Sequence, residues 1–244
     1  MTKITTTTLA LALALGVTAC DDETPEPTVE ATENAAEAAQ AEGESEAADT
    51  PEGAAPGQAD VAAAEAAEAP ETATVGQPAP DFTLTDQAGT EHTLADLRGK
   101  IVVLEWINPQ CPFVQRHYGA GTMTGLDGEL PDDEVTWLAI DSSNFVEAAD
   151  AEAWRSEHDI AYPILLDAEG TVGHRYGART TPHMFVIDGE GVLRYSGAID
   201  DDPRGREESP TNYVGQAVSA LREGRAVETS QTEPYGCSVK YEAS

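Results

Sequence analysis

The chain is poor in positive charge. Its 244 residues include 13 lysine and arginine residues against 45 aspartate and glutamate residues, which gives a formal net charge of −32 at pH 7. Binding to a nucleic-acid backbone depends on clustered positive side chains that neutralise phosphates. The charge balance therefore excludes nucleic acid as an expected partner.

Lysine, arginine and aromatic residues are absent from the segment 21–74, which holds sixteen of the acidic residues. Alanine, glutamate and proline make up most of this segment. Such a composition cannot bury enough apolar surface to offset the entropy of ordering the chain, and the like charges repel one another. We expect a disordered, extended tether that holds a folded domain away from its attachment point.

The N-terminal region lacks a hydrophobic run long enough to span a membrane, since its apolar stretch LALALGV covers only residues 11–17. Lys3 is the only charge before this stretch, and residues 1–19 are typical of a signal peptide. The sequence VTAC at 17–20 resembles the bacterial lipobox, whose cysteine is lipidated and becomes the first mature residue. The alternative is an ordinary secretory signal followed by a chance cysteine.

A lipid on Cys20 would anchor the protein to a membrane of the cell envelope, because each buried methylene contributes about 0.8 kcal/mol. The protein would then face the periplasm or the exterior. Asp21, the next residue, resembles a Gram-negative signal that retains lipoproteins at the inner membrane. The expected organisation is a signal peptide at 1–19, a lipidated cysteine and tether at 20–74, and one folded domain at 75–244.

Residues 75–244 have a length that suits a single hydrophobic core. Apolar periodicity and turn residues predict the following elements: a hairpin of 82–84 and 91–93, a short helical turn at 94–97, strands at 101–106, 135–140 and 162–166, helices from 112 onward and at 147–157, 171–176 and 210–222, and a second hairpin of 184–187 and 192–196. Strands and helices alternate before an antiparallel pair and a last helix. This order predicts an α/β protein with a mixed sheet.

One cysteine stands where a strand runs into a helix. The apolar run 101–104 leads into a short loop that ends in Cys111, and Pro112 is a residue typical of a first helical turn. The positive end of a helix dipole favours the thiolate, which is the nucleophilic form of cysteine. The position therefore indicates an attacking thiol. A buried structural cysteine is the alternative, because free cysteine packs well in cores.

The opening of the domain, VGQPAPDFTLTDQAGTEHTLADLRGK at 75–100, resembles the redoxin family, which includes alkyl hydroperoxide reductase-like and thiol-specific antioxidant proteins. The family pattern G-x-x-A-P-D-F-x-L, D-x-x-G and L-x-x-L-x-G-K is matched by Gly76, Ala79, Pro80, Asp81, Phe82, Leu84, Asp86, Gly89, Leu94, Leu97, Gly99 and Lys100. The stretch WINPQCPFVQRHY at 106–118 is similar to a peroxiredoxin-like subgroup marked by W-x-N-x-x-C-P-F-V. The resemblance implies a thioredoxin-like fold, with a mixed central sheet flanked by helices and an N-terminal hairpin extension.

The chain departs from its relatives at the positions that define their sites. Thioredoxins carry C-x-x-C, and Val114 replaces the second cysteine. Peroxiredoxins carry P-x-x-x-T-x-x-C, and Leu104 and Asn108 occupy the first two of those positions. The arginine that activates peroxide aligns with Pro182. What remains is a single attacking thiol, Cys111, which could reduce a peroxide or a disulfide through a sulfenic acid or a mixed disulfide.

The resemblance also implies supporting residues around Cys111. Thr181 and Pro182 are similar to the pair at the cis-proline of thioredoxins, which packs against the active cysteine and offers backbone groups to an extended substrate. Glu105 stands where thioredoxins place a buried acid that relays protons; the alternative is a partly exposed strand glutamate. The other supporting positions are Trp106, expected in or beside the site, Asn108, Pro112 and His183. Arg116 and His117 either stabilise the thiolate or face solvent.

Cysteine is scarce: the chain has three, and lipidation of Cys20 would leave Cys111 and Cys237. Two thiols in an oxidising compartment suggest a disulfide. Cys237 could be a resolving cysteine that replaces what Val114 removed. It could instead form a permanent bond that fixes the tail, or it could stay free or pair between chains.

Metal binding competes with thiol chemistry, because some thioredoxin-fold proteins bind copper through C-x-x-x-C and a distant histidine. Here Gln115 occupies the second cysteine position, so we expect no metal and no cofactor. We interpret the chain as a membrane-tethered thiol oxidoreductase that acts on a peroxide or a protein disulfide with an unidentified thiol as electron donor. The alternative is a non-catalytic lipoprotein that uses the fold as an envelope scaffold or interaction module.

Overall fold

The structure, a computed structural model, describes residues 72–242. The expected signal peptide, Cys20, Asp21 and nearly all of the expected tether lie outside the described residues.

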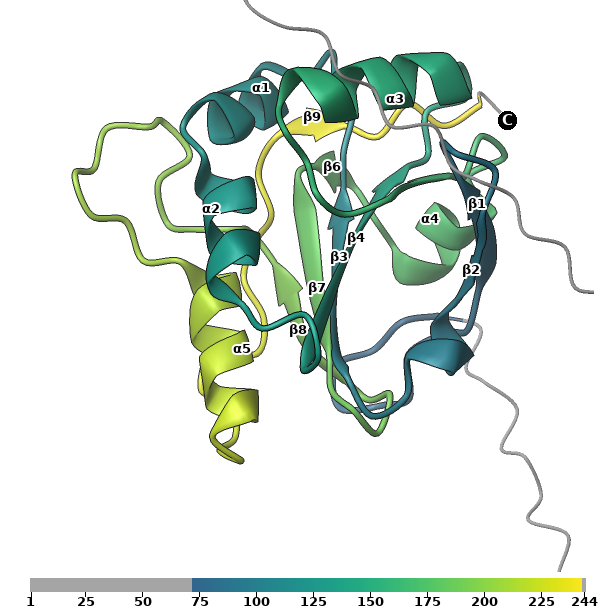
Figure 1. Cartoon of the computed structure of the whole chain (residues 1–244). Coiled ribbons are helices and arrows are strands. Elements are labelled where there is room, and N and C mark those ends of the chain that lie inside the picture. The colour runs from purple at the N-terminus through teal and green to yellow at the C-terminus, as the bar shows by residue number, and fades with distance from the viewer. Residues whose placement is uncertain (1–71, 243–244) are drawn as a thin grey trace, which may run out of the picture. The chain divides into compact units, whose positions relative to one another are not determined.

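A seven-stranded sheet forms the centre of the domain, in the order β2-β1-β5-β4-β3-β7-β8 (Figure 1). The strands of this sheet are β1 (Thr83–Asp86), β2 (Glu91–Thr93), β3 (Ile101–Trp106), β4 (Val135–Asp141), β5 (Ile164–Leu166), β7 (His183–Ile187) and β8 (Leu193–Gly197). β3 runs parallel to β4 and β4 runs parallel to β5, whereas β7 is antiparallel to β3 and β8. The N-terminal hairpin of β1 and β2 extends the sheet beyond β5. The sheet is therefore mixed, as predicted.

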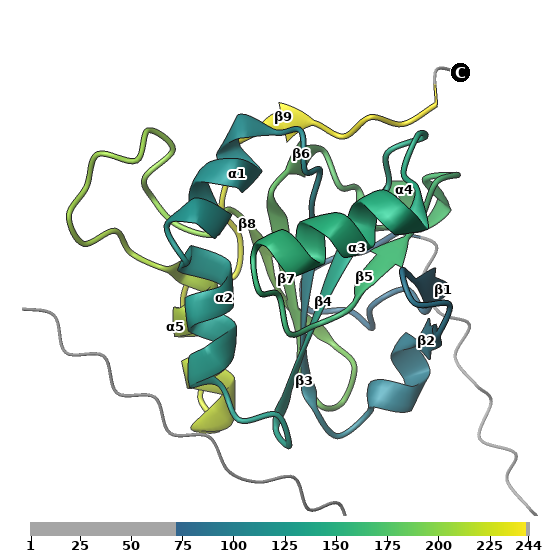
Figure 2. The same ribbon diagram turned by 45° about the horizontal axis from the view of Figure 1, so that its top comes forward.

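Helices cover both faces of this sheet (Figures 1 and 2). They are α1 (Pro112–Gly119), α2 (Thr122–Glu129), α3 (Ala148–Glu157), α4 (Thr171–Tyr176), α5 (Tyr213–Arg222) and the short 3-10 helix η1 (Leu94–Leu97). Residues of α1, α2, α3 and α5 pack into one core cluster, and residues of α4 and η1 pack into the other. This is the thioredoxin-like fold with an N-terminal hairpin.

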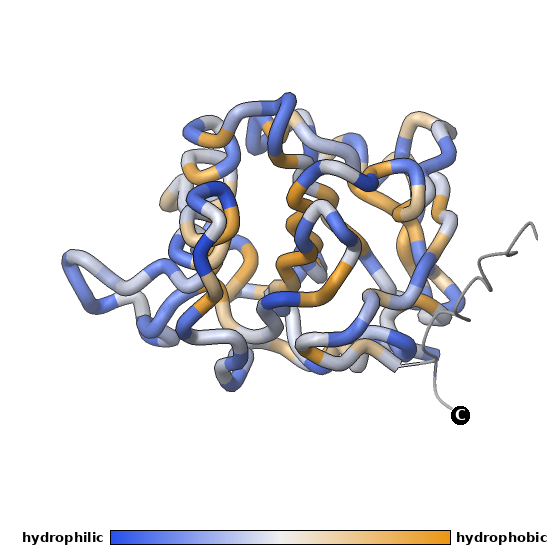
Figure 3. The backbone as a smooth tube through the Cα atoms, turned by 90° about the horizontal axis from the view of Figure 1, so that it is seen from below, coloured by the Kyte–Doolittle hydropathy of each residue, from blue (hydrophilic) through white to orange (hydrophobic). Residues whose placement is uncertain are grey.

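The alternation of side chains along β3 divides the core in two. Ile101 and Val103 point into the cluster that also contains Cys111, and Val102 and Leu104 point into the opposite cluster. All six residues of β3 are buried. The apolar segments therefore lie along the central strands, whereas the long loop that precedes α5 is mostly hydrophilic (Figure 3). The chain leaves the carboxyl end of β3 through a short loop and enters α1, and Cys111 lies at this junction.

Two short elements and one helix were not predicted. A separate two-stranded sheet pairs β6 (Thr180–Thr181) with β9 (Cys237–Ser238). Two-residue strands carry no periodicity, so only the folded chain reveals this pairing. The helix α2 contains Gly125 and Gly128. Because glycine has a low helix propensity, the sequence of this segment does not predict a helix.

Candidate active site

Cys111 is the N-cap residue of α1. Its backbone is extended (φ −82°, ψ 122°), and Pro112 opens the helix after it. Asn108 shapes the preceding turn, because its carbonyl accepts from the Cys111 N–H at 2.9 Å and its side-chain oxygen accepts from the Gln110 N–H at 2.7 Å. The Asn108 amide in turn donates to Ser143 Oγ at 2.9 Å. The site therefore lies just after the carboxyl end of β3. The hydrogen bond from Asn108 to Ser143 connects it to the segment that follows β4.

The C-terminal tail brings a second sulfur to Cys111. Cys237 lies in β9, 126 positions away in the sequence, and its Sγ is 2.7 Å from Cys111 Sγ. The sulfurs are closer than a non-bonded contact and farther apart than the roughly 2.05 Å of a disulfide. Cys111 is almost fully buried, with 2% of its surface exposed, whereas Cys237 is half-buried. The two thiols form one close pair, in which Cys237 lies nearer to solvent.

The two thiols differ in their pKa values. Burial alone would raise the pKa of Cys111, but hydrogen bonds from the Cys237 thiol and from the backbone N–H groups of Val114 and Cys237 stabilise the thiolate, and the net effect lowers that pKa. Burial and the neighbouring Cys111 sulfur raise the pKa of Cys237 to about 11. Cys111 is therefore the first of the two thiols to ionise, and Cys237 keeps its proton to a higher pH.

Titration of the two thiols tests this asymmetry. In a reduced chain carrying Cys20→Ser, thiolate absorbance should rise with a first midpoint below the free-cysteine value of about 8.5. Cys237→Ala should move that midpoint upward, because it removes a hydrogen bond to the thiolate. A first midpoint at or above about 8.5 would contradict an activated Cys111.

Thr181 and Pro182 close the site from the side of β6. While Cys111 is protonated, its thiol donates to the Thr181 carbonyl at 2.9 Å. The Thr181–Pro182 peptide bond is cis, as the resemblance implied. The Thr181 hydroxyl is buried with no hydrogen-bond partner among the described residues. The Thr181 backbone thus contacts Cys111 and pairs with Cys237 in β9.

Glu105 is fully buried on the same face of β3 as the Cys111 cluster. Its Oε2 accepts from Tyr118 at 3.2 Å, from Trp137 at 3.1 Å and from Tyr162 at 3.4 Å, and its Oε1 has no partner. Burial raises the pKa of Glu105 to about 7, against the lowering effect of these three donors. Of the two readings of Glu105, the partly exposed strand glutamate is wrong. A carboxyl group with this pKa exchanges its proton near neutral pH.

Two expected supporting residues do not join this group. The Trp106 ring lies in the opposite core cluster, 5.0 Å from Phe185 and 5.2 Å from Tyr176 between ring centroids. The His183 ring lies 4.4 Å from Phe185. Burial, assisted by the charge of Arg179, lowers the pKa of His183 to about 3, so it stays neutral. The positions of the two rings follow from the alternation of side chains along a strand. Trp106 and His183 are partners in the β3–β7 register, and both side chains point away from Cys111.

Arg116 and His117 contact the tail instead of facing solvent. His117 is buried, and its Nε2 lies 3.0 Å from the hydroxyl of Tyr235. Tyr235 also donates to Asp200, and Arg116 donates to the Asp202 carbonyl at 3.1 Å. Burial lowers the pKa of His117 to about 4, so a neutral His117 supplies no positive charge to the thiolate. The network instead fixes the tail two residues before Cys237.

Five aromatic residues near the site carried no role in the sequence reasoning: Tyr118, Trp137, Tyr162, Tyr235 and Tyr241. The first three surround Glu105, and the last two flank Cys237 in the tail. The short motifs H-Y at 117–118 and P-Y-G-C at 234–237 were the available signals, since a tyrosine that buries its ring usually finds a partner for its hydroxyl.

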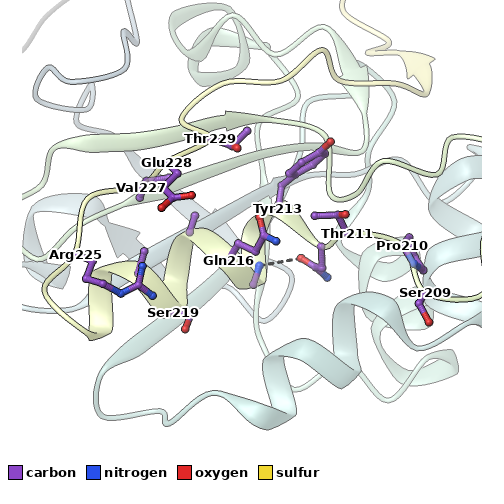
Figure 4. Close-up of a pocket in the computed structure, with 14 residues that line it drawn as sticks. Ser209, Pro210, Thr211, Tyr213, Gln216, Ser219, Arg225, Val227, Glu228 and Thr229 are labelled. Carbon is purple, nitrogen blue, oxygen red and sulfur yellow. Dashed lines mark hydrogen bonds between the residues drawn. The ribbon is translucent and has the colours of Figure 1, made fainter.

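The structure shows a surface hollow beside α5, away from both cysteines (Figure 4). Tyr213, Gln216, Arg225 and Glu228 are among its lining residues. The Asn212 side chain accepts from the Gly215 N–H at 2.8 Å and caps the helix there. The residues that line this hollow therefore include the cap of α5 and neither cysteine of the thiol pair.

Within residues 72–242, no three histidine, cysteine, aspartate or glutamate side chains are grouped so as to hold a metal ion. Over the same range, no helix combines the length and the apolar character that a membrane span requires.

Comparison with known proteins places this site in a family. The AhpC/TSA family profile matches residues 75–196, half of the chain. The chain belongs to the AhpC/TSA family. The match begins at the resemblance noted above and includes Cys111 and the Thr181–Pro182 pair, whereas β9 with Cys237 lies beyond its end.

Relatives in this family differ in how much of the chain they share. Thiol-disulfide oxidoreductase ResA of Geobacillus thermodenitrificans is 31% identical over 121 residues, which are 49% of this chain and 67% of ResA. Peroxiredoxin-2 of Cricetulus griseus is 32% identical over 179 residues, which are 68% of this chain and 89% of that protein. Both relatives are thiol-dependent oxidoreductases by name, and the chain is of that class.

A solved structure agrees with the fold over nearly its whole length. The crystal structure of a hypothetical protein from Sinorhizobium meliloti 1021 is 30% identical and superposes with a TM-score of 0.65. The match covers 71% of this chain and 97% of that protein. The match therefore spans nearly the whole of that solved chain.

Proposed function

We propose that this protein is a thiol oxidoreductase that cycles between a reduced Cys111–Cys237 pair and a disulfide between the same two residues. The observation that carries the proposal is the 2.7 Å separation of the two sulfurs. Val114 removes the cysteine that thioredoxins place in the same helix, and Cys237 from the tail supplies a second thiol at that point. Cys111 is the attacking sulfur and Cys237 the resolving one.

The proposed cycle balances for either substrate class. With a peroxide, the Cys111 thiolate attacks one oxygen and becomes a sulfenic acid. The second oxygen leaves as hydroxide or alkoxide and takes up the proton that Cys111 released on ionising, which gives water or an alcohol. The Cys237 thiol then attacks the sulfenic sulfur and releases water. With a disulfide, Cys111 forms a mixed disulfide that Cys237 resolves, and two substrate thiols leave. An external thiol donor returns the Cys111–Cys237 disulfide to the reduced pair.

Glu105 fits the cycle as a proton acceptor and donor. Its pKa of about 7 allows it to take the Cys237 proton during resolution and return it on reduction. The unpartnered Oε1 is free to accept a further hydrogen bond. The donors on Oε2 hold the group in place.

A single turnover tests the proposal. Reduced chain carrying Cys20→Ser should lose both remaining thiols on reaction with one equivalent of hydrogen peroxide, and non-reducing peptide mapping should recover a Cys111–Cys237 bond. The same experiment with an equivalent of a small disulfide identifies which substrate class reacts faster. If neither oxidant produces the bond, the two-cysteine cycle is wrong.

The membrane tether is a separate part of the proposal. Cys20 follows a lipobox-like sequence, and the chain from there to the domain is acidic and lacks aromatic residues. Cys20→Ser should move the protein from the membrane fraction to the soluble fraction of a Gram-negative host, while the turnover of the domain stays unchanged. Equal partition of the two proteins would remove the lipid anchor from the proposal.

A further inference from the structure

Main-chain hydrogen bonds attach the C-terminal tail to the domain on both sides of Cys237. After Cys237, the Val239 N–H donates to the Arg179 carbonyl at 3.2 Å. Before Cys237, the Thr232 N–H donates to the Ser196 carbonyl of β8 at 3.1 Å. The cysteine of the tail therefore lies between two attachment points, and what holds the chain between them decides how precisely its sulfur is placed.

The four residues between Thr232 and Cys237 are attached through side chains. In the part of the chain that the structure describes, none of the turn and loop main-chain hydrogen bonds involves them. Glu233 pairs with Arg179, but 83% and 62% of these two side chains are exposed, and exposed ion pairs contribute little stability. The placement of Cys237 from this side therefore depends on Tyr235.

Tyr235 contacts a buried carboxylate and the helix α1. Its hydroxyl donates to Asp200, which is buried, and hydrogen bonds to charged groups are among the stronger ones. Burial and the neighbouring Asp200 hold the pKa of Tyr235 well above its ordinary range, so the hydroxyl keeps the proton that it donates. The ring lies 5.9 Å from the Phe113 ring between centroids, and the guanidinium carbon of Arg116 lies 5.9 Å from the Tyr235 centroid, within the range of a cation–π interaction.

These contacts place both sulfurs relative to the same helix. The aromatic and cationic partners of the Tyr235 ring belong to α1, whose N-cap is Cys111. Only Gly236 separates Tyr235 from Cys237, and it packs so closely that a Cβ there would lie 2.1 Å from the Thr181 carbonyl oxygen. A shift of the tyrosine would therefore be passed directly to the Cys237 sulfur.

We propose that Tyr235 is a positioning residue for the resolving step: its hydroxyl, bonded to Asp200, holds the Cys237 sulfur against Cys111 and thereby limits the overoxidation of Cys111 by peroxide. The inference rests on the proposed function, because it requires a sulfenic acid on Cys111 that Cys237 captures.

Two reactions compete for that sulfenic acid. In the first, the Cys237 thiol attacks the sulfenic sulfur, the sulfur–sulfur bond forms and water leaves. In the second, a further molecule of hydrogen peroxide oxidises the sulfenic acid to a sulfinic acid and is itself reduced to water. A thiol that is held in contact with its target reacts at a high effective concentration. Loosening Cys237 slows only the first reaction, so sulfinic acid should form at lower peroxide concentrations.

The test measures the peroxide concentration at which half of Cys111 becomes sulfinic acid. Reduced full chain carrying Cys20→Ser is mixed with increasing excesses of hydrogen peroxide, and mass spectrometry counts the two products. This midpoint reports the competition between the two later reactions and not the rate of the first attack by Cys111. Tyr235→Phe keeps the ring and removes the hydroxyl, and we expect it to lower the midpoint at least tenfold. An unchanged midpoint would overturn the proposal.

Tyr176→Phe is the matched control. It removes a buried hydroxyl that donates to the Pro80 carbonyl at 2.7 Å, in the core cluster on the other face of the sheet. We expect its midpoint to stay within twofold of the parent chain. A fall as large as that of Tyr235→Phe would show that loosening the domain anywhere exposes Cys111 to overoxidation, and it would overturn the specific role of Tyr235.

Asp200→Asn tests the partner of the hydroxyl. The amide oxygen still accepts a hydrogen bond but carries no charge, so we expect the midpoint to fall at least threefold. The double variant with Tyr235→Phe should fall no further than Tyr235→Phe alone, because the two groups act through one hydrogen bond. Effects that multiply in the double variant would overturn the coupling. If circular dichroism shows that Tyr235→Phe does not fold, the midpoint of Asp200→Asn decides the proposal alone.

The parent chain distinguishes a failure of this inference from a failure of the proposed function. If the parent chain forms no Cys111–Cys237 bond at any peroxide concentration, the peroxide cycle is wrong and this inference fails with it. If the parent chain forms the bond and the Tyr235→Phe midpoint equals that of the parent, the cycle stands and only the positioning role of Tyr235 is rejected.

Discussion

Replacement of Cys111 by serine should abolish turnover of both hydrogen peroxide and a model disulfide, with a loss of about a thousandfold or more. The reason is chemical, because the thiolate is the nucleophile in both reactions and a serine hydroxyl does not ionise at neutral pH. The lowered pKa of Cys111 makes it the thiol of the pair that ionises first. Steady-state rates with an added thiol donor measure the loss.

The matched control is Cys237→Ser, which keeps Cys111 and removes only the resolving thiol. We expect one equivalent of hydrogen peroxide to convert Cys111 to a sulfenic acid in this variant, and excess peroxide to drive it to sulfinic acid, because no neighbouring thiol condenses with it. Mass spectrometry distinguishes the two states. A Cys111→Ser protein as active as the wild type would remove Cys111 from the mechanism. A Cys111 that stays unoxidised in the control would favour the scaffold interpretation.

The parts of the site that could be predicted are those that local sequence determines. The apolar run of β3 followed by Cys111 and Pro112 predicts a cysteine at a helix start, and the structure places it there. Thr181 and Pro182 come from the family pattern, and the cis bond follows it. Each of these features depends on neighbours in the chain or on a motif of a few residues.

The parts that escaped prediction depend on distant contacts. The raised pKa of Glu105 arises from burial among Tyr118, Trp137 and Tyr162, which come from separate elements. The pairing of Cys237 with Cys111 spans 126 positions, and β6 and β9 are too short to leave a periodic pattern. The direction of each side chain on β3 depends on the register of the strand. Trp106 and Glu105 are adjacent in the sequence, yet they point to opposite faces of the sheet.

The buried carboxyl of Glu105 should make the domain less stable as the pH rises from 4.5 to 7. The folded-state pKa of about 7 lies above the ordinary value of 4.5, so the folded state binds this proton more tightly than the unfolded state does. The contribution to stability is therefore full below pH 4.5, falls as the pH rises, and is lost above pH 7. The shift corresponds to a loss of about 3 kcal/mol.

Glu105→Gln removes this titration and keeps the shape of the side chain. The stability difference between the variant and the wild type should shift by about 3 kcal/mol in favour of the variant between pH 4.5 and pH 8. In a domain of this size, that corresponds to a relative gain in Tm of about 6–12 °C. The change with pH is the quantity to compare, because any fixed cost of placing an amide beside the unpartnered position of Oε1 cancels in it.

Asp141→Asn provides the matched control, because Asp141 is also buried and burial raises its pKa to about 6. The difference in unfolding free energy between Asp141→Asn and the wild type should level off near pH 6. The corresponding difference for Glu105→Gln should level off about one pH unit higher. Urea unfolding at each pH measures both curves. Turnover separates the two roles of Glu105: a slowing of about a hundredfold or more in Glu105→Gln supports proton transfer to and from the thiol pair. Wild-type turnover, combined with the expected stability curve, would leave Glu105 as a buried structural acid, and a flat stability curve would show that its proton affinity is ordinary.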